Sequence, residues 1–239
     1  MSTPDKRHSR YQNCLPVLIL PIPAKPPTRT NQASPQVDPM PETPLILASA
    51  SQIRLTLLQN AGITVTAHPA RIDEDAIRRA LQAEHAKPRD IADTLAELKA
   101  RKLAQRHPQA LVLGCDQVLA LNDHVFAKPG SLDEARLQLA QLRNQTHHLH
   151  SALVLYHNAQ PIWRQIDTAK LTMRDASDAY LDAYLSRQWP TVATSIGAYQ
   201  LESEGIRLFS SIEGDYFTIL GLPLLPLLAY LNLRGFIAS

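Results

Sequence analysis

The chain has 239 residues, of which 45% are apolar and 19% charged, and its formal net charge is +2. This length suits one large domain, or one domain with a tail, and is enough to bury a core without disulfide or metal staples. Two cysteines exclude a disulfide framework and a four-cysteine zinc site, so we expect a reducing, cytoplasmic location. The small net charge excludes a nucleic-acid partner bound by phosphate neutralisation, and no apolar run reaches the ~20 residues that span a bilayer.

The N-terminal segment differs in composition from the rest of the chain, because 10 of the 18 prolines lie in its first 44 residues. Repeated proline disfavours helix, so we predict an extended or disordered extension over residues 1–43 and a folded domain over residues 44–239. A basic and then apolar start is similar in outline to a signal peptide, but Pro16 and Pro21 interrupt it. Met40 is an alternative initiator, which would leave the domain alone.

Apolar periodicity and capping residues predict that strands and helices alternate along the domain. Strands are expected at 45–48, 65–67, 111–114, 147–157, 161–173, 207–212 and 216–220, with a hairpin turn at 122–123. Helices are expected from Ser49 or Ser51 to Gly62, and at 74–85, 88–103, 133–142, 176–187 and 223–235. The alternation favours an α/β fold with a mixed sheet.

The sequence contains neither of the common glycine-rich phosphate loops, GxxxxGKS and GxGxxG, nor the GxSxG motif of serine hydrolases. Polar residues instead follow predicted strands, where ligands bind in α/β sheets. Ser49, Ser51 and Arg54 join hydroxyls and a guanidinium at a helix start, which makes an anion site. The alternative is that the serines only cap the helix and that Arg54 lies on its wet face.

Two carboxylates and two lysines are further candidates. Asp116 comes directly after a predicted buried strand, where it either holds Mg²⁺ or takes a proton from water, or is an ordinary turn aspartate. Glu74 opens a predicted helix, where it either binds a divalent cation or satisfies the helix dipole. Lys99 and Lys128 either contact phosphate or are ordinary surface lysines.

Two other features are weaker candidates for a functional site. His148 and His150 share one face of a predicted strand, but no third metal ligand is apparent, so the HHLH run is interpreted as a polar strand face. Cys115 stands beside Asp116, and nothing local lowers the pKa of its thiol, so we do not expect a nucleophile.

Seven stretches of the domain occur in an order typical of one family: LILASASQIRLTLLQNAGI, RIDED, LAELKARKLA, VLGCDQVL, AKPGS, GAYQLESEG and IEGDYFTILGLPLLPLL. Together they resemble the Maf family of nucleoside triphosphate pyrophosphatases over about residues 45–233. The resemblance implies a Maf/ITPase-like fold, in which helices flank a long mixed sheet and a cleft separates two lobes. It also implies hydrolysis of a nucleoside triphosphate between its α and β phosphates with Mg²⁺ or Mn²⁺, and it leaves room for a homodimer.

The family's site residues carry over by motif. Asp116 matches the general base, and the matching phosphate-binding residues are Ser49, Ser51, Arg54, Lys99 and Lys128. Glu74, together with Asp116, matches the metal ligands.

Substrate preference in this family is set at three positions, which here are Ile53, Gln117 and Glu202. The last two are similar to the 7-methyl-GTP type, whereas Ile53 can neither stack on a base nor form an ion pair. Glu202 can accept hydrogen bonds from guanine, so we expect a preference for purine substrates. The alternatives are a cell-division regulator that acts by nucleotide binding and an ITP-type house-cleaning pyrophosphatase. Gln52 and Leu55 depart from the family pattern, which usually has proline and often a basic residue there.

Overall fold

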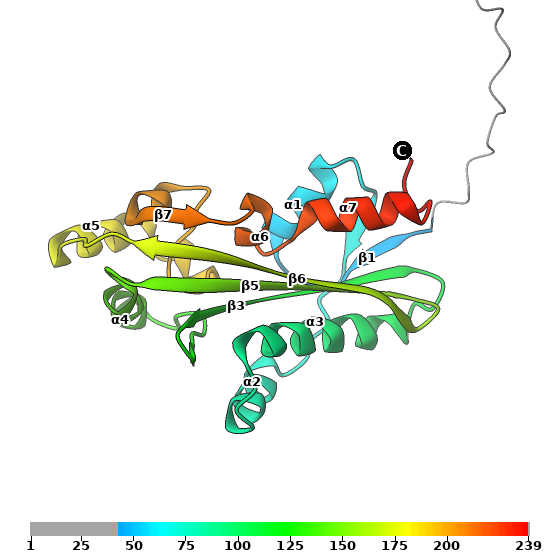
Figure 1. Ribbon diagram of the computed structural model, residues 1–239, viewed down its shortest axis with the longest axis horizontal. Helices are drawn as coiled ribbons and strands as arrows, with labels where there is room; N and C mark the ends of the chain where they lie inside the picture. Colours follow the sequence, from blue (N-terminus) through cyan, green and yellow to red (C-terminus); the bar gives the residue numbers. More distant parts are fainter. Residues whose placement is uncertain (1–42, 239) are drawn as a thin grey trace, which may run out of the picture. The chain divides into compact units, whose positions relative to one another are not determined.

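The apolar runs form one mixed seven-stranded sheet in a computed structural model that describes residues 43–238 (Figure 1). The strands are β1 (Leu45–Leu47), β2 (Val65–Ala67), β3 (Leu111–Leu121), β4 (His124–Val125), β5 (Thr146–His157), β6 (Gln160–Met173) and β7 (Phe209–Glu213). Their order is β2-β1-β3-β5-β6-β7, with β4 paired to β3. The pairs β1–β2 and β1–β3 are parallel and the others antiparallel, so the predicted mixed α/β sheet is confirmed. The predictions for residues 1–42 lie outside the described residues.

The helices begin and end at the residues that helix chemistry favours. They are α1 (Gln52–Asn60), α2 (Glu74–Ala83), α3 (Pro88–Ala104), α4 (Leu132–Leu142), α5 (Asp178–Gln188), α6 (Tyr216–Ile219) and α7 (Leu224–Leu233), with 3₁₀ turns at Thr191–Thr194 and Glu204–Leu208. Pro88 opens α3, and the side chains of Asp73, Ser131 and Ser177 accept capping hydrogen bonds at α2, α4 and α5. Gly62 follows α1 with φ +77°, as expected of a helix stop.

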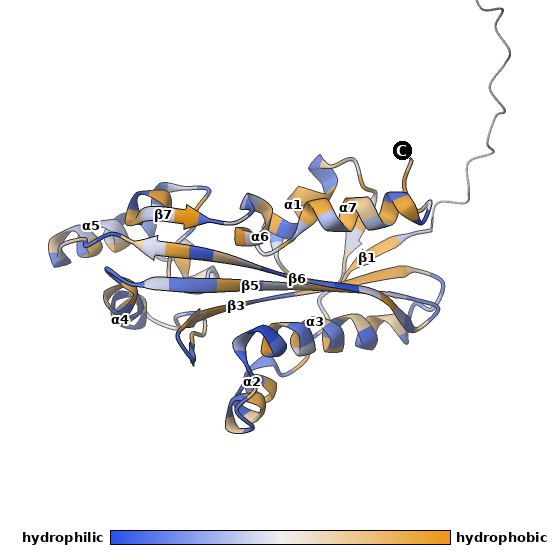
Figure 2. Ribbon diagram, in the orientation of Figure 1, coloured by the Kyte–Doolittle hydropathy of each residue, from blue (hydrophilic) through white to orange (hydrophobic). Residues whose placement is uncertain are grey.

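Helices cover both faces of the sheet, with α3 on one face and α1 and α7 on the other (Figure 1). The alternation of β3 follows these layers, because Leu113 and Cys115 pack in the cluster of α1 and α7, whereas Val112 and Val118 pack in the cluster of α3. Helix α7 is apolar over most of its length, while α3 carries polar residues on its outer side (Figure 2). Among residues 43–238 no helix is long and apolar enough to cross a bilayer.

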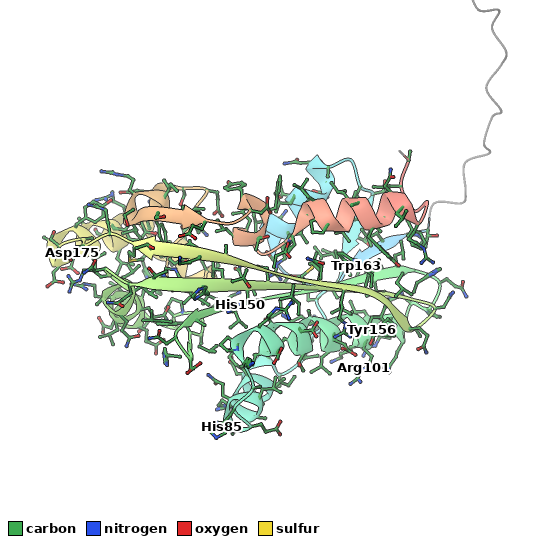
Figure 3. The ribbon with its side chains drawn as sticks, in the orientation of Figure 1. His85, Arg101, His150, Tyr156, Trp163 and Asp175 are labelled. Carbon is green, nitrogen blue, oxygen red and sulfur yellow. The ribbon has the colours of Figure 1, made fainter. Side chains whose placement is uncertain are left out.

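Aromatic residues on β5 and β6 reach the two layers (Figure 3). The Tyr156 hydroxyl donates a 3.2 Å hydrogen bond to Glu97 of α3. The ring of Trp163 stacks on Tyr230 of α7 with centroids 5.1 Å apart. Each helical layer is therefore tied to the long antiparallel strands that form the centre of the sheet.

The predicted strand at 216–220 is wrong, because residues Tyr216–Ile219 form helix α6. The side chain of Asp215 accepts hydrogen bonds from the amide and the hydroxyl of Thr218, at 2.9 and 3.3 Å. This N-cap outweighs the strand propensity of an aromatic and β-branched run. The strand predicted from residue 207 begins only at Phe209, since a 3₁₀ turn occupies Glu204–Leu208.

The predicted strand at 111–114 continues to Leu121, so Asp116 lies inside β3 and not after it. One edge of β3 pairs with β5 from Val112 to Ala120. On the other edge β1 pairs only as far as Leu113, and β4 pairs only from Ala120. Among the described residues, the intervening stretch has no strand on that side, so its side chains border an open space beside the end of β1.

Candidate active site

A cleft of about 1110 Å³ opens beside this uncovered edge of β3. It is large enough for a ligand of small-molecule size. Its lining includes every site residue that the sequence singles out: Ser49, Ser51, Ile53, Arg54, Glu74, Lys99, Asp116, Gln117, Lys128 and Glu202. The fold therefore brings together, in one concave site, residues that lie far apart along the chain.

Lys99 forms the centre of a charged cluster in the cleft. Its Nζ lies 2.7 Å from Oδ1 of Asp116 and 2.9 Å from Oε2 of Glu74. The side chains of Lys99 and Asp116 are only 8% and 6% exposed, so this lysine is not a surface lysine. The other carboxylate oxygen of Asp116, Oδ2, is buried and has no hydrogen-bond partner among the described residues.

The electrostatics of Asp116 result from two opposing effects. Burial raises the pKa of its carboxyl group above the ordinary value, and the charge and hydrogen bond of Lys99 lower it. Burial is the larger effect, so the pKa is raised overall. A carboxylate with a raised pKa is a stronger base than an exposed aspartate.

Arg54 reaches across from α1 to the backbone of β3. Its Nη1 donates to the carbonyl oxygen of Cys115 at 3.0 Å and to Oγ of Ser49 at 3.4 Å. Its Nε is buried without a partner among the described residues. Arg54 is 9% exposed, so it does not lie on the wet face of the helix. Ser51 occupies the N-cap position of α1, but its side chain makes no capping hydrogen bond. The alternative of a helix-capping side chain is therefore wrong for Ser51, and the alternative of a wet-face position is wrong for Arg54.

Lys128 follows β4 and lies at the rim of the cleft. Partial burial and, to a lesser degree, charge repulsion from Arg54 lower the pKa of its ammonium group. Arg54, Lys99 and Lys128 thus bring three positive charges to a cleft that Arg71 and Arg78 also line.

Gln117 points to the opposite face of β3 from Asp116, toward α6. Its Nε2 lies 3.0 Å from Oγ of Ser151 and 3.1 and 2.9 Å from the carbonyl oxygens of Thr218 and Ile219. These contacts fix the amide nitrogen against protein. The carbonyl oxygen Oε1 makes no hydrogen bond among the described residues, and Gln117 lines the cleft.

Sequence reasoning missed a buried pair behind the cleft wall. His147 is fully buried, and its Nε2 lies 2.8 Å from the hydroxyl of Tyr199, which lines the cleft. Burial lowers the pKa of His147 to about 4. The interpretation as a polar strand face is wrong for His147, although His148 and His150 do share a face, with stacked rings 6.0 Å apart. Tyr199 belongs to the GAYQLESEG stretch, which was the available signal.

Cys115 is completely buried in the cluster of α1 and α7, and burial raises the pKa of its thiol to about 11. At neutral pH it is therefore the protonated thiol. This agrees with the expectation that nothing local lowers the pKa of this thiol.

The Maf-like protein family matches residues 44–233. A nucleoside triphosphate pyrophosphatase of Roseobacter denitrificans is 55% identical over 196 residues, which cover 82% of this chain and 98% of that protein. Nucleoside triphosphate pyrophosphatase 1 of Jannaschia sp. is 54% identical over 194 residues, which cover 81% of this chain and 98% of that protein. A 7-methyl-GTP pyrophosphatase of Rhizobium meliloti is 49% identical over 191 residues, which cover 80% of this chain and 96% of that protein.

Among solved structures, a HAM1 protein from Coxiella burnetii aligns with a TM-score of 0.38 and 16% identity, over 56% of this chain and 74% of that chain. This likeness is too distant to carry an argument. The family match and the relatives at about half identity, which this chain covers almost from end to end, are decisive. The chain belongs to the Maf family.

Proposed function

We propose that this protein is a nucleoside triphosphate pyrophosphatase, a hydrolase that cleaves the bond between the α and β phosphates. The products are a nucleoside monophosphate and pyrophosphate. The observation that carries the proposal is the unpartnered, buried Oδ2 of Asp116 in a cleft that also holds Arg54, Lys99 and Lys128. The names of the relatives support the same activity.

The three cations match the charge of the substrate. A triphosphate is a polyanion, and its hydrolysis depends mainly on positioning and on neutralising charge as the bridging bond breaks. Arg54 and Lys128 are held close enough to repel each other, and an anion between them relieves that repulsion. The hydroxyls of Ser49 and Ser51 add hydrogen bonds at the start of α1.

Asp116 acts as the general base. Because Lys99 occupies Oδ1, the free Oδ2 accepts the proton of the attacking water. The water oxygen forms a bond to the α phosphorus, the bond from that phosphorus to the bridging oxygen breaks, and pyrophosphate leaves with the electron pair. The raised pKa of Asp116 favours proton acceptance, and the charge of Lys99 opposes that rise.

The residues present fit a divalent cation. Magnesium is often held by one or two carboxylates together with substrate phosphates, and Asp116 and Glu74 are two carboxylates that lie within 3 Å of one lysine nitrogen in the cleft. Among residues 43–238 no cluster of three or more His, Cys, Asp or Glu side chains could hold a metal alone, so substrate oxygens would complete the shell. The chemistry that Mg²⁺ or Mn²⁺ supplies when bound is neutralisation and polarisation of the phosphates.

The substrate preference that we propose is for purines, including 7-methyl-GTP. Oε1 of Gln117 and the carboxylate of Glu202 are acceptors in the cleft, and guanine presents paired N–H donors that pyrimidines lack at that edge. Ile53 adds an apolar contact without stacking. A relative named 7-methyl-GTP pyrophosphatase at 49% identity supports this preference.

A pyrophosphate-release assay over a panel of nucleoside triphosphates, with Mg²⁺, Mn²⁺ or a chelator, tests the proposal. Asp116→Asn should lower the rate by about 10²-fold or more while the protein stays folded, because a general base contributes that much. Asp123→Asn, in the exposed turn after β3, is the matched control and should keep the rate. Full activity of Asp116→Asn would refute the mechanism, and dTTP or UTP turned over as fast as 7-methyl-GTP would refute the preference. The same panel tests the ITP-type alternative.

We place the enzyme in the cytoplasm and propose that it forms a homodimer. Leu225 and Leu233 of α7 are 58% and 80% exposed, and a second copy would cover such apolar surface. Light scattering measures the mass in solution, and a monomer at all concentrations would contradict the dimer.

A further inference from the structure

A second pocket, of about 440 Å³, adjoins the cleft and has a basic lining. Five of the side chains that line it carry basic nitrogen atoms: His68, Arg71, Lys102, Arg106 and His107. The remaining lining residues are small or apolar: Ala67, Pro69, Ala70 and Leu103. Among the described residues that line this basic pocket, none is acidic.

The fold brings together the segments that carry these side chains. His68 and Arg71 belong to the segment between β2 and α2, while Lys102 lies in the last turn of α3 and Arg106 just beyond it. The Lys102 ammonium donates a 2.7 Å hydrogen bond to the carbonyl oxygen of Arg71, whose backbone has φ +48°. A non-glycine residue adopts this left-handed conformation only where the surroundings impose it. The rings of His68 and His107 lie 5.7 Å apart and complete the wall.

The charges of the basic pocket are not balanced within the described part of the chain. Arg71, Lys102 and Arg106 form no ion pair there; Arg71 and Arg106 are exposed, and Lys102 is half-buried. Three like charges around one small cavity repel each other, and a bound anion would remove that cost. Arginine presents paired N–H donors that match two oxygens of a phosphate group.

We infer that the basic pocket is a second oxyanion site, which binds a phosphorylated small molecule apart from the nucleotide cleft. Its volume lies in the range of small-molecule sites, and its concave shape favours such a ligand over a nucleic-acid strand. Pro69, Ala70 and Arg71 line both cavities, so the two ligands would lie on either side of one short segment. The inference goes beyond the proposed function and requires no turnover.

Calorimetric titration of the full chain tests the inference, with the cleft first saturated by a non-hydrolysable α,β-methylene analogue of GTP. Pyrophosphate and GMP are the two probes, because the shared chemistry is a phosphate group and the source is open. We expect one further site per chain for at least one probe. The double substitution Lys102→Gln and Arg106→Gln should weaken it roughly tenfold or more, since each removes a charge-assisted hydrogen bond. Arg79→Gln, an exposed arginine of α2 that lines neither cavity, should leave it unchanged.

Arg106→Glu is the second variant, because it reverses a charge but keeps the hydrogen bond from Lys102 to Arg71, and it should abolish the site. Absence of a further site in the saturated wild-type chain overturns the inference, as does a site that both Arg106 variants leave intact. If the analogue fails to bind the cleft while the basic pocket still binds a probe, the proposed function fails and this inference stands.

Discussion

Lys99 and Asp116 form a buried ion pair in which Nζ lies 2.7 Å from Oδ1, although one comes from helix α3 and the other from the middle of strand β3. A buried pair contributes little net stability, because desolvation offsets most of the attraction. Its effect is on ionisation: Lys99 lowers the pKa of Asp116, and the more distant Glu74 raises it. Lys99 and Glu74 therefore shift the pKa of the base in opposite directions.

We expect Lys99→Gln and Glu74→Gln to move the acid limb of the pH–rate profile in opposite directions. The reaction needs ionised Asp116, so the rate falls as the pH drops through the pKa of its carboxyl group. Removal of Lys99 raises that pKa and shifts the limb to higher pH, whereas removal of Glu74 lowers it and shifts the limb to lower pH. The measurement is kcat/KM against pH. Lys87→Gln, an exposed lysine at the start of α3, is the control, and parallel shifts of the two variants would contradict the prediction.

Gly114→Ala should separate α3 from β3. A Cβ at residue 114 would lie 2.0 Å from the carbonyl oxygen of Ala96 and 2.8 Å from Cβ of Ala100, both on α3. Because backbone atoms cannot yield, we expect a loss of about 3 kcal/mol or more in the free energy of unfolding by urea. Gly130→Ala is the matched control, since its nearest neighbour is the flexible side chain of Glu134 at 3.3 Å. Equal stability of the two variants would show that the layers do not touch as described.

The elements that sequence predicts well are those with long periodic patterns or strong caps. Helix α3 carries proline at its first position and a continuous apolar stripe, and β5 and β6 are 12 and 14 residues long, with alternation over part of each. Helix α6 could not be found in this way, because four residues are too few for a period and only the Asp215 cap distinguishes them from a strand.

The candidate site was predictable as a set of residues but not as a geometry. Taken singly, Glu74 could equally satisfy the helix dipole and Lys99 could be an ordinary surface lysine. Only the order of the seven motifs along the chain indicated that these residues belong to one site. The contact between His147 and Tyr199 spans 52 positions and depends on which strand faces which loop. Local patterns carry no information on such contacts, so this pair could not be derived from them.

His147 should make folding stability depend on pH. Its pKa is lowered from 6.5 to about 4 in the folded chain, so the unfolded chain binds a proton more readily between these values. The stability is fully present above about pH 6.5 and is lost as the pH falls toward 4, by an amount of about 3 kcal/mol. His147→Gln should remove this dependence in urea unfolding at several pH values. His124→Gln, on the exposed start of β4, should keep it, and a His147→Gln curve parallel to the wild type would contradict the argument.

Gly221→Ala should disturb catalysis through Arg54. Gly221 has φ +84°, and a Cβ there would lie 2.9 Å from Nη2 and 3.1 Å from Nε of Arg54. Gly62 has a similar φ of +77° but nothing within 4 Å of an added Cβ. Both alanine variants carry about 1–2 kcal/mol of left-handed backbone strain. Only Gly221→Ala displaces the guanidinium, so we expect it alone to lower kcat/KM, by roughly tenfold as for a lost charge-assisted hydrogen bond.

A double-mutant cycle with Arg54→Lys tests whether Arg54 mediates this loss. If Gly221 acts by holding the guanidinium in place, Gly221→Ala should cost much less activity in the Arg54→Lys background than in the wild type, because the group it displaces is already gone. Additive losses would mean that Gly221 acts elsewhere in the cleft. Equal losses in Gly62→Ala and Gly221→Ala would assign the effect to backbone strain and not to Arg54.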